Sequence, residues 1–301
     1  MKRLENVGIL GHPKRASTKP VGAHIESTLK SHGINTWHYE EWKADDAREA
    51  IPGSDMVIAI GGDGAMLRAA RLSAEFDVPV LGINMGRLGF LTEVNEPEDW
   101  DSYLEKLLNG DYWIERRMMI TARVERNEKI LHEGNALNDV VISGLSAGSM
   151  IQADLYIDNH WATTYNSDAL IVSTPTGSTA YALAAGGPIL PPDLSNILIV
   201  PTASHLSMDR PIVLSEGSQV AVKLSVENRN STIITVDGIE LAQITENDIL
   251  YVEACDYVSR FIRMRERNYF YRSLLDRLEP RVNRSLPENR TLKPMRGKIN
   301  E

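Results

Sequence analysis

A glycine-rich turn that carries one carboxylate is the part of the sequence best suited to chemistry. Gly61-Gly62-Asp63-Gly64 follows the apolar run 56–60 and precedes a helix-compatible segment, 65–74. Glycines let the backbone approach a ligand closely, and the helix N-terminus offers unpaired N–H groups to phosphate. The negative charge of Asp63 would repel phosphate, so this side chain needs another task, either accepting a proton from an attacking hydroxyl or holding a divalent metal ion. A strand-to-helix turn without a ligand is the alternative interpretation.

Two common nucleotide-binding motifs are absent from the sequence. No GxxxxGK[ST] motif occurs, and the first apolar run continues into GILGHP at 8–13 where a GxGxxG motif would stand. The sequence therefore supports neither a P-loop nor a Rossmann dinucleotide site.

A second glycine-rich segment, NMGRLGFLT at 84–92, follows an apolar run that ends at Ile83. Open α/β sheets bind ligands at this carboxyl edge of their strands. Arg87 is a candidate phosphate contact there, and the alternative is an arginine that is exposed or paired with a carboxylate.

A run rich in hydroxyl groups, TPTGSTAY at 174–181, is followed by GGPI at 186–189. Small hydroxyl residues can line a polar nucleotide cleft, and Tyr181 can stack on a base. The alternative is a Ser/Thr-rich loop that caps a helix beginning near Ser178.

Polar residues also stand at the ends of two apolar runs. Asn138 and Asp139 precede the run 140–142, and Asp168 precedes the run 169–172. Such residues usually form turns. Together with the glycine-rich segments, they supply the acceptors and donors that a ribose and a carboxamide need.

The first hundred residues alternate between apolar runs and amphipathic stretches, which predicts parallel strands joined by helices. We expect strands at 7–10, 34–39, 55–60 and 78–83, and a helix at 20–32 that stops at Gly33. From about residue 111 short β-type stretches follow, such as 120–126, 153–157 and 233–236, with turn signals at 158–159, 216–217 and 237–238. This texture predicts a second, mainly antiparallel domain.

The composition limits the class of protein. The chain has 301 residues, of which 43% are hydrophobic and 24% are charged, as in soluble globular proteins. A net charge of -9 argues against a nucleic-acid partner. Cys255 is the only cysteine, and no apolar run approaches the ~20 residues of a membrane span, so we expect a cytoplasmic protein with no membrane contact.

Taken in order, these motifs resemble those of the bacterial NAD kinase family. GGDG alone is shared with diacylglycerol and sphingosine lipid kinases and with phosphofructokinases, whereas TPTGSTAY followed by GGPI resembles NAD kinases alone. The motifs lie between residues 61 and 189, and the β-rich texture to about residue 275 fits the same family.

The resemblance implies an N-terminal open α/β, Rossmann-like domain at 1–98 and a C-terminal β-sandwich-like, NAD-binding domain at 99–265, with the active site in the cleft between them. A helix at about 266–279 would return to the first domain, and 280–301 would be a poorly ordered tail. Asp63 would be the general base that takes the proton of the 2′-hydroxyl of the adenosine ribose of NAD. That oxygen would then attack the γ-phosphate of ATP, giving NADP and ADP.

The resemblance also assigns binding residues by position. Asn138 and Asp139 would hold the adenosine part, Asp168 would lie near the nicotinamide carboxamide, and Arg68 falls where the family often has a basic ligand contact. The full nucleotide-binding and NAD-binding set comprises Gly61, Gly62, Gly64, Arg68, Asn138, Asp139, Asn166, Asp168, Thr176, Thr179, Ala180, Tyr181, Ala182, Leu183 and Ala184.

Two positions depart from the family pattern. Asn166 stands where many members have a basic residue, and Ile239 stands where a glutamine is common. Both leave the choice between NAD and NADH open. The family also implies a divalent cation, Mg²⁺ bound with ATP and not in a cage of protein ligands, and self-association as a homodimer or homotetramer.

Two other functions share some of these features. A lipid or sugar kinase can use the same turn, but a lipid acceptor needs an apolar pocket, which the hydroxyl-rich run 174–181 disfavours. A non-catalytic nucleotide-binding regulator would keep the cleft without the chemistry, and the presence of Asp63 disfavours it.

Overall fold

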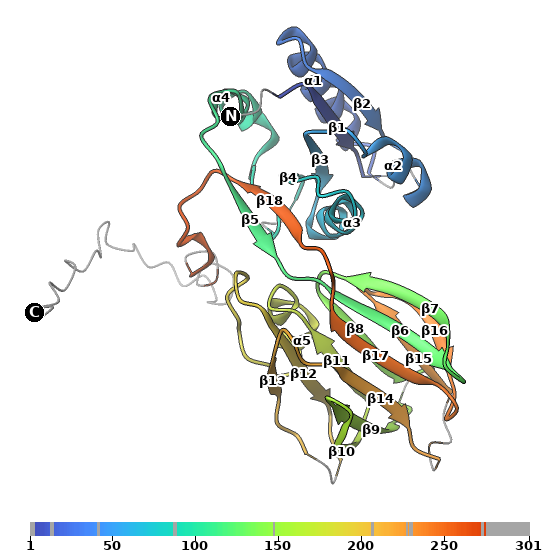
Figure 1. The fold of residues 1–301 in the computed structure, drawn as a ribbon. Helices are drawn as coiled ribbons and strands as arrows, with labels where there is room; N and C mark the ends of the chain where they lie inside the picture. The colour runs from blue at the N-terminus through green and yellow to red at the C-terminus, as the bar shows by residue number, and fades with distance from the viewer. Residues whose placement is uncertain are drawn as a thin grey trace, which may run out of the picture. The chain divides into compact units, whose positions relative to one another are not determined.

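The computed structural model describes residues 4–12, 15–40, 43–86, 89–146, 148–205, 208–226, 228, 231–271 and 274. The chain divides into two units, Met1–Arg265 and Glu266–Glu301. Three six-stranded sheets lie in the first unit (Figure 1). Because most of the second unit lies outside the described residues, the expected returning helix at 266–279 and the expected tail at 280–301 stay predictions.

The first sheet has the order β2-β1-β3-β4-β18-β5. Its strands are β1 (Asn6–Leu10), β2 (Asn35–Tyr39), β3 (Met56–Gly61), β4 (Val80–Asn84), β5 (Trp113–Arg117) and β18 (Ser259–Arg263). The first four pair in parallel, and β18 runs parallel to β4 and antiparallel to β5. Its helices are α1 (Thr18–Ser31), α2 (Ala44–Ala50), α3 (Asp63–Ala74) and α4 (Trp100–Asn109), the last preceded by the 3-10 turn η1 (Pro97–Asp99).

Both faces of the central strands β1, β3 and β4 are buried, which explains why these strands read as continuous apolar runs. Successive side chains of a strand point to opposite faces. In β3, Val57 and Ala59 pack in the core that contains α2 and α3. Ile58 and Ile60 pack in the core that contains α1 and α4. The four predicted parallel strands and the first predicted helix are confirmed, with small shifts at their ends.

The other two sheets are antiparallel and enclose a single hydrophobic core. One has the order β10-β9-β14-β17-β6-β7 and the other β13-β12-β11-β8-β15-β16. Their strands are β6 (Ile120–Arg126), β7 (Lys129–Ala136), β8 (Asp139–Gly144), β9 (Ile151–Ile157), β10 (His160–Ser167), β11 (Ala169–Ser173), β12 (Asn196–Thr202), β13 (Ile212–Ser215), β14 (Val220–Leu224), β15 (Thr232–Val236), β16 (Ile239–Ile244) and β17 (Ile249–Ala254). The expected antiparallel sandwich is therefore present.

Local sequence explains the tight hairpins of the sandwich. Asp158 and Asn159 connect β9 to β10 with φ of 50° and 65°, and Asp237 and Gly238 connect β15 to β16 with φ of 48° and 75°. Two-residue hairpin turns require such left-handed backbone, which Asn, Asp and Gly tolerate best. Both turns were predicted from these residue pairs.

The sheets do not follow the expected division at residue 98. Helix α4 contributes Trp100 to the core of the first sheet. Strands β5 and β18 also belong to that sheet, although both fall inside the range 99–265 that was expected to form the β-rich domain. The physical reason is that β18 covers the edge of β4, which would otherwise present unpaired backbone groups, and Phe261 fills the core beside α3.

Among the residues that the structure describes, no helix combines the length and the apolar character that a membrane crossing requires.

Candidate active site

Asp63 is the first residue of α3, and its carboxylate binds the loop after β4 that contains Phe90 and Leu91. It accepts hydrogen bonds from the backbone N–H groups of Phe90, at 2.7 Å, and Leu91, at 3.0 Å. A Cβ atom at Gly89 would lie only 1.9 Å from Asp63 Oδ1, so only glycine permits this approach. The second glycine-rich segment therefore folds onto the carboxylate of the first, and Arg87 lies outside the described residues.

A second carboxylate, that of Asp237, holds the start of β8. It accepts hydrogen bonds from the backbone N–H groups of Leu137, Asn138 and Asp139, at 3.0, 2.8 and 3.2 Å. Arg71, two turns after Asp63 on α3, lies 3.8 Å from Asp237 Oδ2. The helix that carries Asp63 is thus tied by an ion pair to the carboxylate that holds Asn138 and Asp139.

Burial raises the pKa values of both carboxylates at this second site, Asp139 and Asp237. Burial first, and then the negative charge of Asp237, raises the pKa of Asp139 to about 7. Burial also raises the pKa of Asp237, although the three backbone N–H groups and Arg71 lower it. Asp139 therefore takes up a proton near neutral pH.

The run after β11 packs directly against Asn138. The Ser173 hydroxyl and the Thr174 N–H donate to the Asn138 carbonyl, at 3.0 and 2.9 Å. A Cβ atom at Gly177 would lie 2.1 Å from that carbonyl oxygen, so glycine is required there as well. The motifs at 137–139 and 174–177 therefore form one structure, although about 35 residues separate them.

Two hydroxyl groups of this run, those of Ser178 and Thr179, bind its own backbone. Ser178 Oγ donates to the Pro175 carbonyl at 2.7 Å, and Thr179 Oγ1 donates to the Thr176 carbonyl at 3.2 Å. Ser178 Oγ also accepts from the Leu190 N–H at 3.0 Å, which ties the GGPI segment to the loop. These hydroxyls shape the loop, and no side-chain cap bond starts the 3-10 turn η2 (Gly177–Thr179).

The next predicted residues form the short helix α5 (Tyr181–Ala184), which lies against the outer face of the second sandwich sheet. Ala182 is fully buried in the small core on that face. Tyr181 is 47% exposed, which leaves its ring accessible to a base. Thr179, Ala180 and Leu183 are partly buried, and Ala184 is exposed.

Asn166 and Asp168 lie at the opposite end of β11 from Asn138. Ser173 pairs with Asp139, whereas Asp168 precedes Ala169, which pairs with Ser143 and Thr202. At about 3.3 Å per residue, Asp168 stands roughly 16 Å along the strand from Ser173. The structure thus brings Asn138, Asp139 and Thr176 together and places Asn166 and Asp168 apart from them.

Arg68 and the glycines of the turn complete the predicted set. Gly61 ends β3, Gly62 precedes α3, and Gly64 and Arg68 lie in its first turns. Burial, and then repulsion from Arg71, lowers the pKa of Arg68. In the described ranges, no cluster of three or more His, Cys, Asp or Glu side chains is placed to hold a metal ion.

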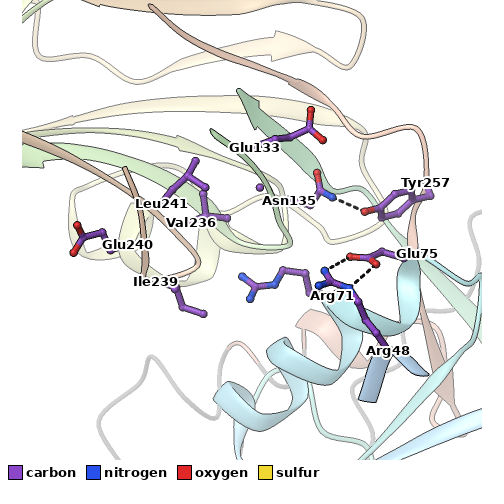
Figure 2. A pocket seen from close by; sticks show the side chains of 11 residues that line it. Arg48, Arg71, Glu75, Glu133, Asn135, Val236, Ile239, Glu240, Leu241 and Tyr257 are labelled. Carbon is purple, nitrogen blue, oxygen red and sulfur yellow. Dashed lines mark hydrogen bonds and ion pairs between the residues drawn. The ribbon is translucent and has the colours of Figure 1, made fainter. Parts of the chain in front are cut away.

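A pocket of about 530 Å³ lies beside the residues that flank Asp237 (Figure 2). Its lining residues are Arg48, Arg71, Glu75, Glu133, Gly134, Asn135, Val236, Ile239, Glu240, Leu241 and Tyr257. Two hydrogen bonds pair Arg48 with Glu75, at 2.7 and 2.9 Å. None of these described lining residues belongs to the predicted nucleotide-binding set, but Ile239, which departs from the family pattern, does line this pocket.

Two features of the site escaped the sequence analysis. Asp237 was noted only as a turn signal, and the segment 89–91 had no assigned partner. Both act through hydrogen bonds to residues 27 to 100 positions away in the chain. The available signal was the carboxylate of Asp237 in a tight hairpin, two residues before Ile239, which departs from the family pattern.

The comparisons with known proteins agree along the chain. Residues 4–112 match the model of the ATP-NAD kinase N-terminal domain, and residues 137–264 match that of the ATP-NAD kinase C-terminal domain. An NAD kinase of Geobacter sp. (strain M21) is 37% identical over 254 residues, which is 84% of this chain and 87% of that protein. An NAD kinase of Chloroflexus aggregans is 37% identical over 275 residues, which is 91% of this chain and 99% of that protein.

Solved structures show the same fold. Yeast NADH kinase complexed with NADH has a TM-score of 0.82 at 21% identity, covering 92% of this chain and 88% of that chain. An NAD kinase from Archaeoglobus fulgidus in complex with ATP has a TM-score of 0.69 at 23% identity, covering 90% and 97%. Both family models, the identity to the bacterial relatives and the shared fold lead to one conclusion: this chain belongs to the NAD kinase family.

Proposed function

We propose that the chain phosphorylates the 2′-hydroxyl of the adenosine ribose of NAD with ATP, giving NADP and ADP, and that Asp63 is the general base. The observation that carries this proposal is the packing of helix α3 against the segment that precedes β8. Helix α3, which begins at Asp63, packs in one core with Leu137, the residue before Asn138. A carboxylate at a helix N-terminus is thereby joined to the segment proposed to hold the adenosine part.

The hydrogen bonds of Asp63 support its proposed role. An ionised carboxylate has about four acceptor positions on its two oxygens. Phe90 and Leu91 use one position on each oxygen. Acceptor positions therefore remain for a substrate hydroxyl, while the two backbone donors fix the orientation of the carboxylate. Such fixed orientation is what a base needs in order to take a proton from the attacking oxygen.

The remaining residues are proposed to bind the two nucleotides. The glycines at 61, 62 and 64 and the N-terminus of α3 would face phosphate groups, with Arg68 as a further basic contact. Asn138 and Asp139 would hold the adenosine part, and Tyr181 offers an exposed ring for stacking. Asp168 would bind the nicotinamide carboxamide, from its position at the far end of β11.

A magnesium ion is proposed to arrive with ATP. Phosphoryl transfer needs the negative charge of the triphosphate neutralised and the phosphate groups aligned, and Mg²⁺ supplies this when bound. Mg²⁺ is usually held by one or two carboxylates together with phosphates and water. Because Asp63 is assigned to proton transfer, we propose that the phosphate groups of ATP and water supply most of the ligands of this ion.

One assay tests the proposed function. Purified protein is incubated with NAD, ATP and MgCl₂, and NADP is measured with an NADP-specific dehydrogenase. We expect NADP to form in proportion to enzyme and time. No NADP above the blank without enzyme would overturn the proposal. Parallel reactions with NADH and with inorganic polyphosphate determine the preferred acceptor and donor. Light scattering of the same preparation tests the proposed homodimer or homotetramer.

A further inference from the structure

A cluster of buried charged side chains lies on the face of the first sheet that packs against α3. Glu115, Arg117 and Arg263 are at most 4% exposed. Glu115 stands opposite Phe261 in the β5–β18 pair. Arg117 lies two residues after Glu115 on β5, and Arg263 lies two residues after Phe261 on β18. Because side chains alternate between faces, all four share one face.

One carboxylate oxygen joins the two arginines. Arg263 Nε donates to Glu115 Oε2 at 2.9 Å, and Arg117 Nε donates to the same atom at 3.0 Å. The guanidinium carbons lie 4.8 Å and 5.1 Å from the centre of the Phe261 ring, for Arg117 and Arg263 respectively. The ring and the shared carboxylate together fix both planar groups, since guanidinium groups bind carboxylates and aromatic rings in defined geometries.

Arg263 also donates a hydrogen bond to the loop that binds Asp63. Its Nη1 donates to the Leu91 carbonyl at 2.9 Å, while the Leu91 N–H donates to Asp63 Oδ1. Both polar backbone groups of Leu91 are thus bound, one by the proposed base and the other by Arg263. Glu93 strengthens this end, because its carboxylate lies 3.3 Å from Arg263 Nη1 and accepts from Arg265 Nε at 2.9 Å.

Arg117 also contacts Thr176, in the segment that packs on Asn138. Its Nη1 lies 3.5 Å from Thr176 Oγ1, at the long end of the hydrogen-bond range. Thr176 is itself 5% exposed and belongs to the predicted dinucleotide-binding set. A continuous series of contacts therefore runs from Asp63 through Leu91, Arg263, Glu115 and Arg117 to Thr176.

We infer that Arg263 and Arg117, joined through Glu115, are positioning residues that set the Asp63-binding loop against the segment around Thr176. This inference rests on the proposed function. Stability alone does not account for the cluster, because buried ion pairs are often no more stabilising than apolar side chains of similar size. The planar guanidinium groups each bind several partners, so they fix the position of the loop at Leu91 relative to the segment at Thr176.

The first test uses a conservative substitution and a matched control. Arg263→Lys keeps the positive charge but loses the planar fork that reaches Glu115 and Leu91 together. Arg126→Lys makes the same change in a bidentate pair with the buried Asp248 in the sandwich, at 2.7 and 2.9 Å. We expect Arg263→Lys to lower kcat by ~10²-fold with a smaller change in KM for NAD, since a small displacement of reacting groups has that effect. We expect Arg126→Lys to leave kcat unchanged.

The second test asks whether Arg263 acts through Asp63. The kcat of Arg263→Lys is measured again in an Asp63→Asn background. If Arg263 positions the base, the second substitution has little further effect once the base is gone. A purely structural role predicts that the two losses multiply. Multiplied losses, or a loss in Arg263→Lys no larger than in Arg126→Lys, would overturn the inference.

A third readout does not depend on catalysis. Hydrogen–deuterium exchange of peptides covering 89–93 should be faster in Arg263→Lys and unchanged in Arg126→Lys. Should Arg263→Lys not fold, Thr176→Val removes the far contact, and kcat is compared at saturating NAD and ATP because Thr176 also belongs to the predicted nucleotide-binding set. We expect kcat to fall severalfold with a normal thermal midpoint. Normal kcat in Thr176→Val would then overturn the inference. A wild type that forms no NADP would instead overturn the proposed function, and the inference with it.

Discussion

Two aspartates, Asp63 and Asp237, do the same structural task at two edges of the candidate site. Each accepts hydrogen bonds from consecutive backbone N–H groups of a distant segment, 90–91 for Asp63 and 137–139 for Asp237. Their surroundings differ. Asp63 stands partly buried at a helix N-terminus, whereas the Asp237 side chain is only 1% exposed and lies beside a second carboxylate, Asp139.

The difference separates a carboxylate suited to chemistry from one suited to architecture. A partly exposed carboxylate at the positive end of a helix stays available to a substrate hydroxyl. A buried carboxylate with three backbone donors has little acceptor capacity left, and its charge adds to the effect of burial in raising the pKa of its neighbour Asp139. Anchoring a loop is common to both aspartates, so only the further properties of Asp63 indicate catalysis.

The largest expected effect separates these two roles. Asp63→Asn and Asp237→Asn each replace an acceptor-only carboxylate by an amide, so each weakens the anchored segment. Only Asp63→Asn also removes the proposed base, and we expect it to lower kcat by ~10²- to 10⁴-fold. NADP formation by both variants is compared at saturating NAD and ATP. Similar losses in the two variants would remove Asp63 from proton transfer.

A substitution at Gly89 disturbs the first anchor and keeps its carboxylate. A Cβ atom there would lie 1.9 Å from Asp63 Oδ1, so Gly89→Ala must displace either the loop or the carboxylate. We expect kcat to fall by ~10²-fold. This loss is at the lower end of the range expected for Asp63→Asn. Gly217→Ala is the control, because no atom lies within 4 Å of its added Cβ. Equal activity of the two variants would contradict the tight contact.

The acidic pair at the second anchor predicts a pH dependence. The pKa of Asp139 is about 7 in the folded chain against an ordinary 3.8, so the folded chain binds more protons between these values. The free energy of unfolding therefore falls as pH rises from about 4 to about 7. Asp139→Asn removes this loss, and we expect it to gain ~2 to 3 kcal/mol relative to wild type between pH 5 and pH 8.

Urea unfolding at the two pH values measures this gain. Asp209→Asn is the control, because its carboxylate is 73% exposed and should show no comparable change between pH 5 and pH 8. An Asp139→Asn variant whose stability relative to wild type does not change with pH would contradict the buried acidic pair.

The smallest expected effect concerns the ion pair between α3 and the second anchor. Arg71→Met removes the positive charge 3.8 Å from Asp237. We expect the free energy of unfolding to fall by about 1 kcal/mol at pH 8, and by less at pH 5, where more of the acidic pair is protonated. Urea unfolding at both pH values tests this. A variant more stable than wild type at pH 8 would show that Arg71 does not offset the charge of Asp237.

Local sequence was sufficient for much of the fold. The parallel strands β1, β3 and β4 have both faces buried, so their apolar runs were readable without any alignment. The hairpins at 158–159 and 237–238 were readable because left-handed backbone selects Asp, Asn and Gly. Helix α4 was missed, although Trp100, Leu104 and Leu107 have helical spacing and are buried.

The buried arginines show why the rest was not predictable. Charged residues are rarely fully buried, so Glu115, Arg117 and Arg263 in two short strands indicate exposed faces when only the sequence is considered. Their burial depends on a partner strand about 150 residues away. The same holds for Asp237, whose carboxylate meets its backbone N–H donors at 137–139 only after β8 and β15 pair. Site residues were named from motifs, whereas the groups that orient them required the tertiary structure.

The position of β18 has a consequence for synthesis on the ribosome. This strand lies between β4 and β5, so the sheet whose strand β3 leads into Asp63 draws one of its inner strands from residues 259–263, about 200 positions after Asp63. The first hundred residues emerge early but cannot complete their sheet until the sandwich has been translated. A nascent chain truncated before β18 should therefore leave the Asp63 turn sensitive to protease. Long-range pairing of this kind slows folding and leaves an unpaired edge exposed in the meantime.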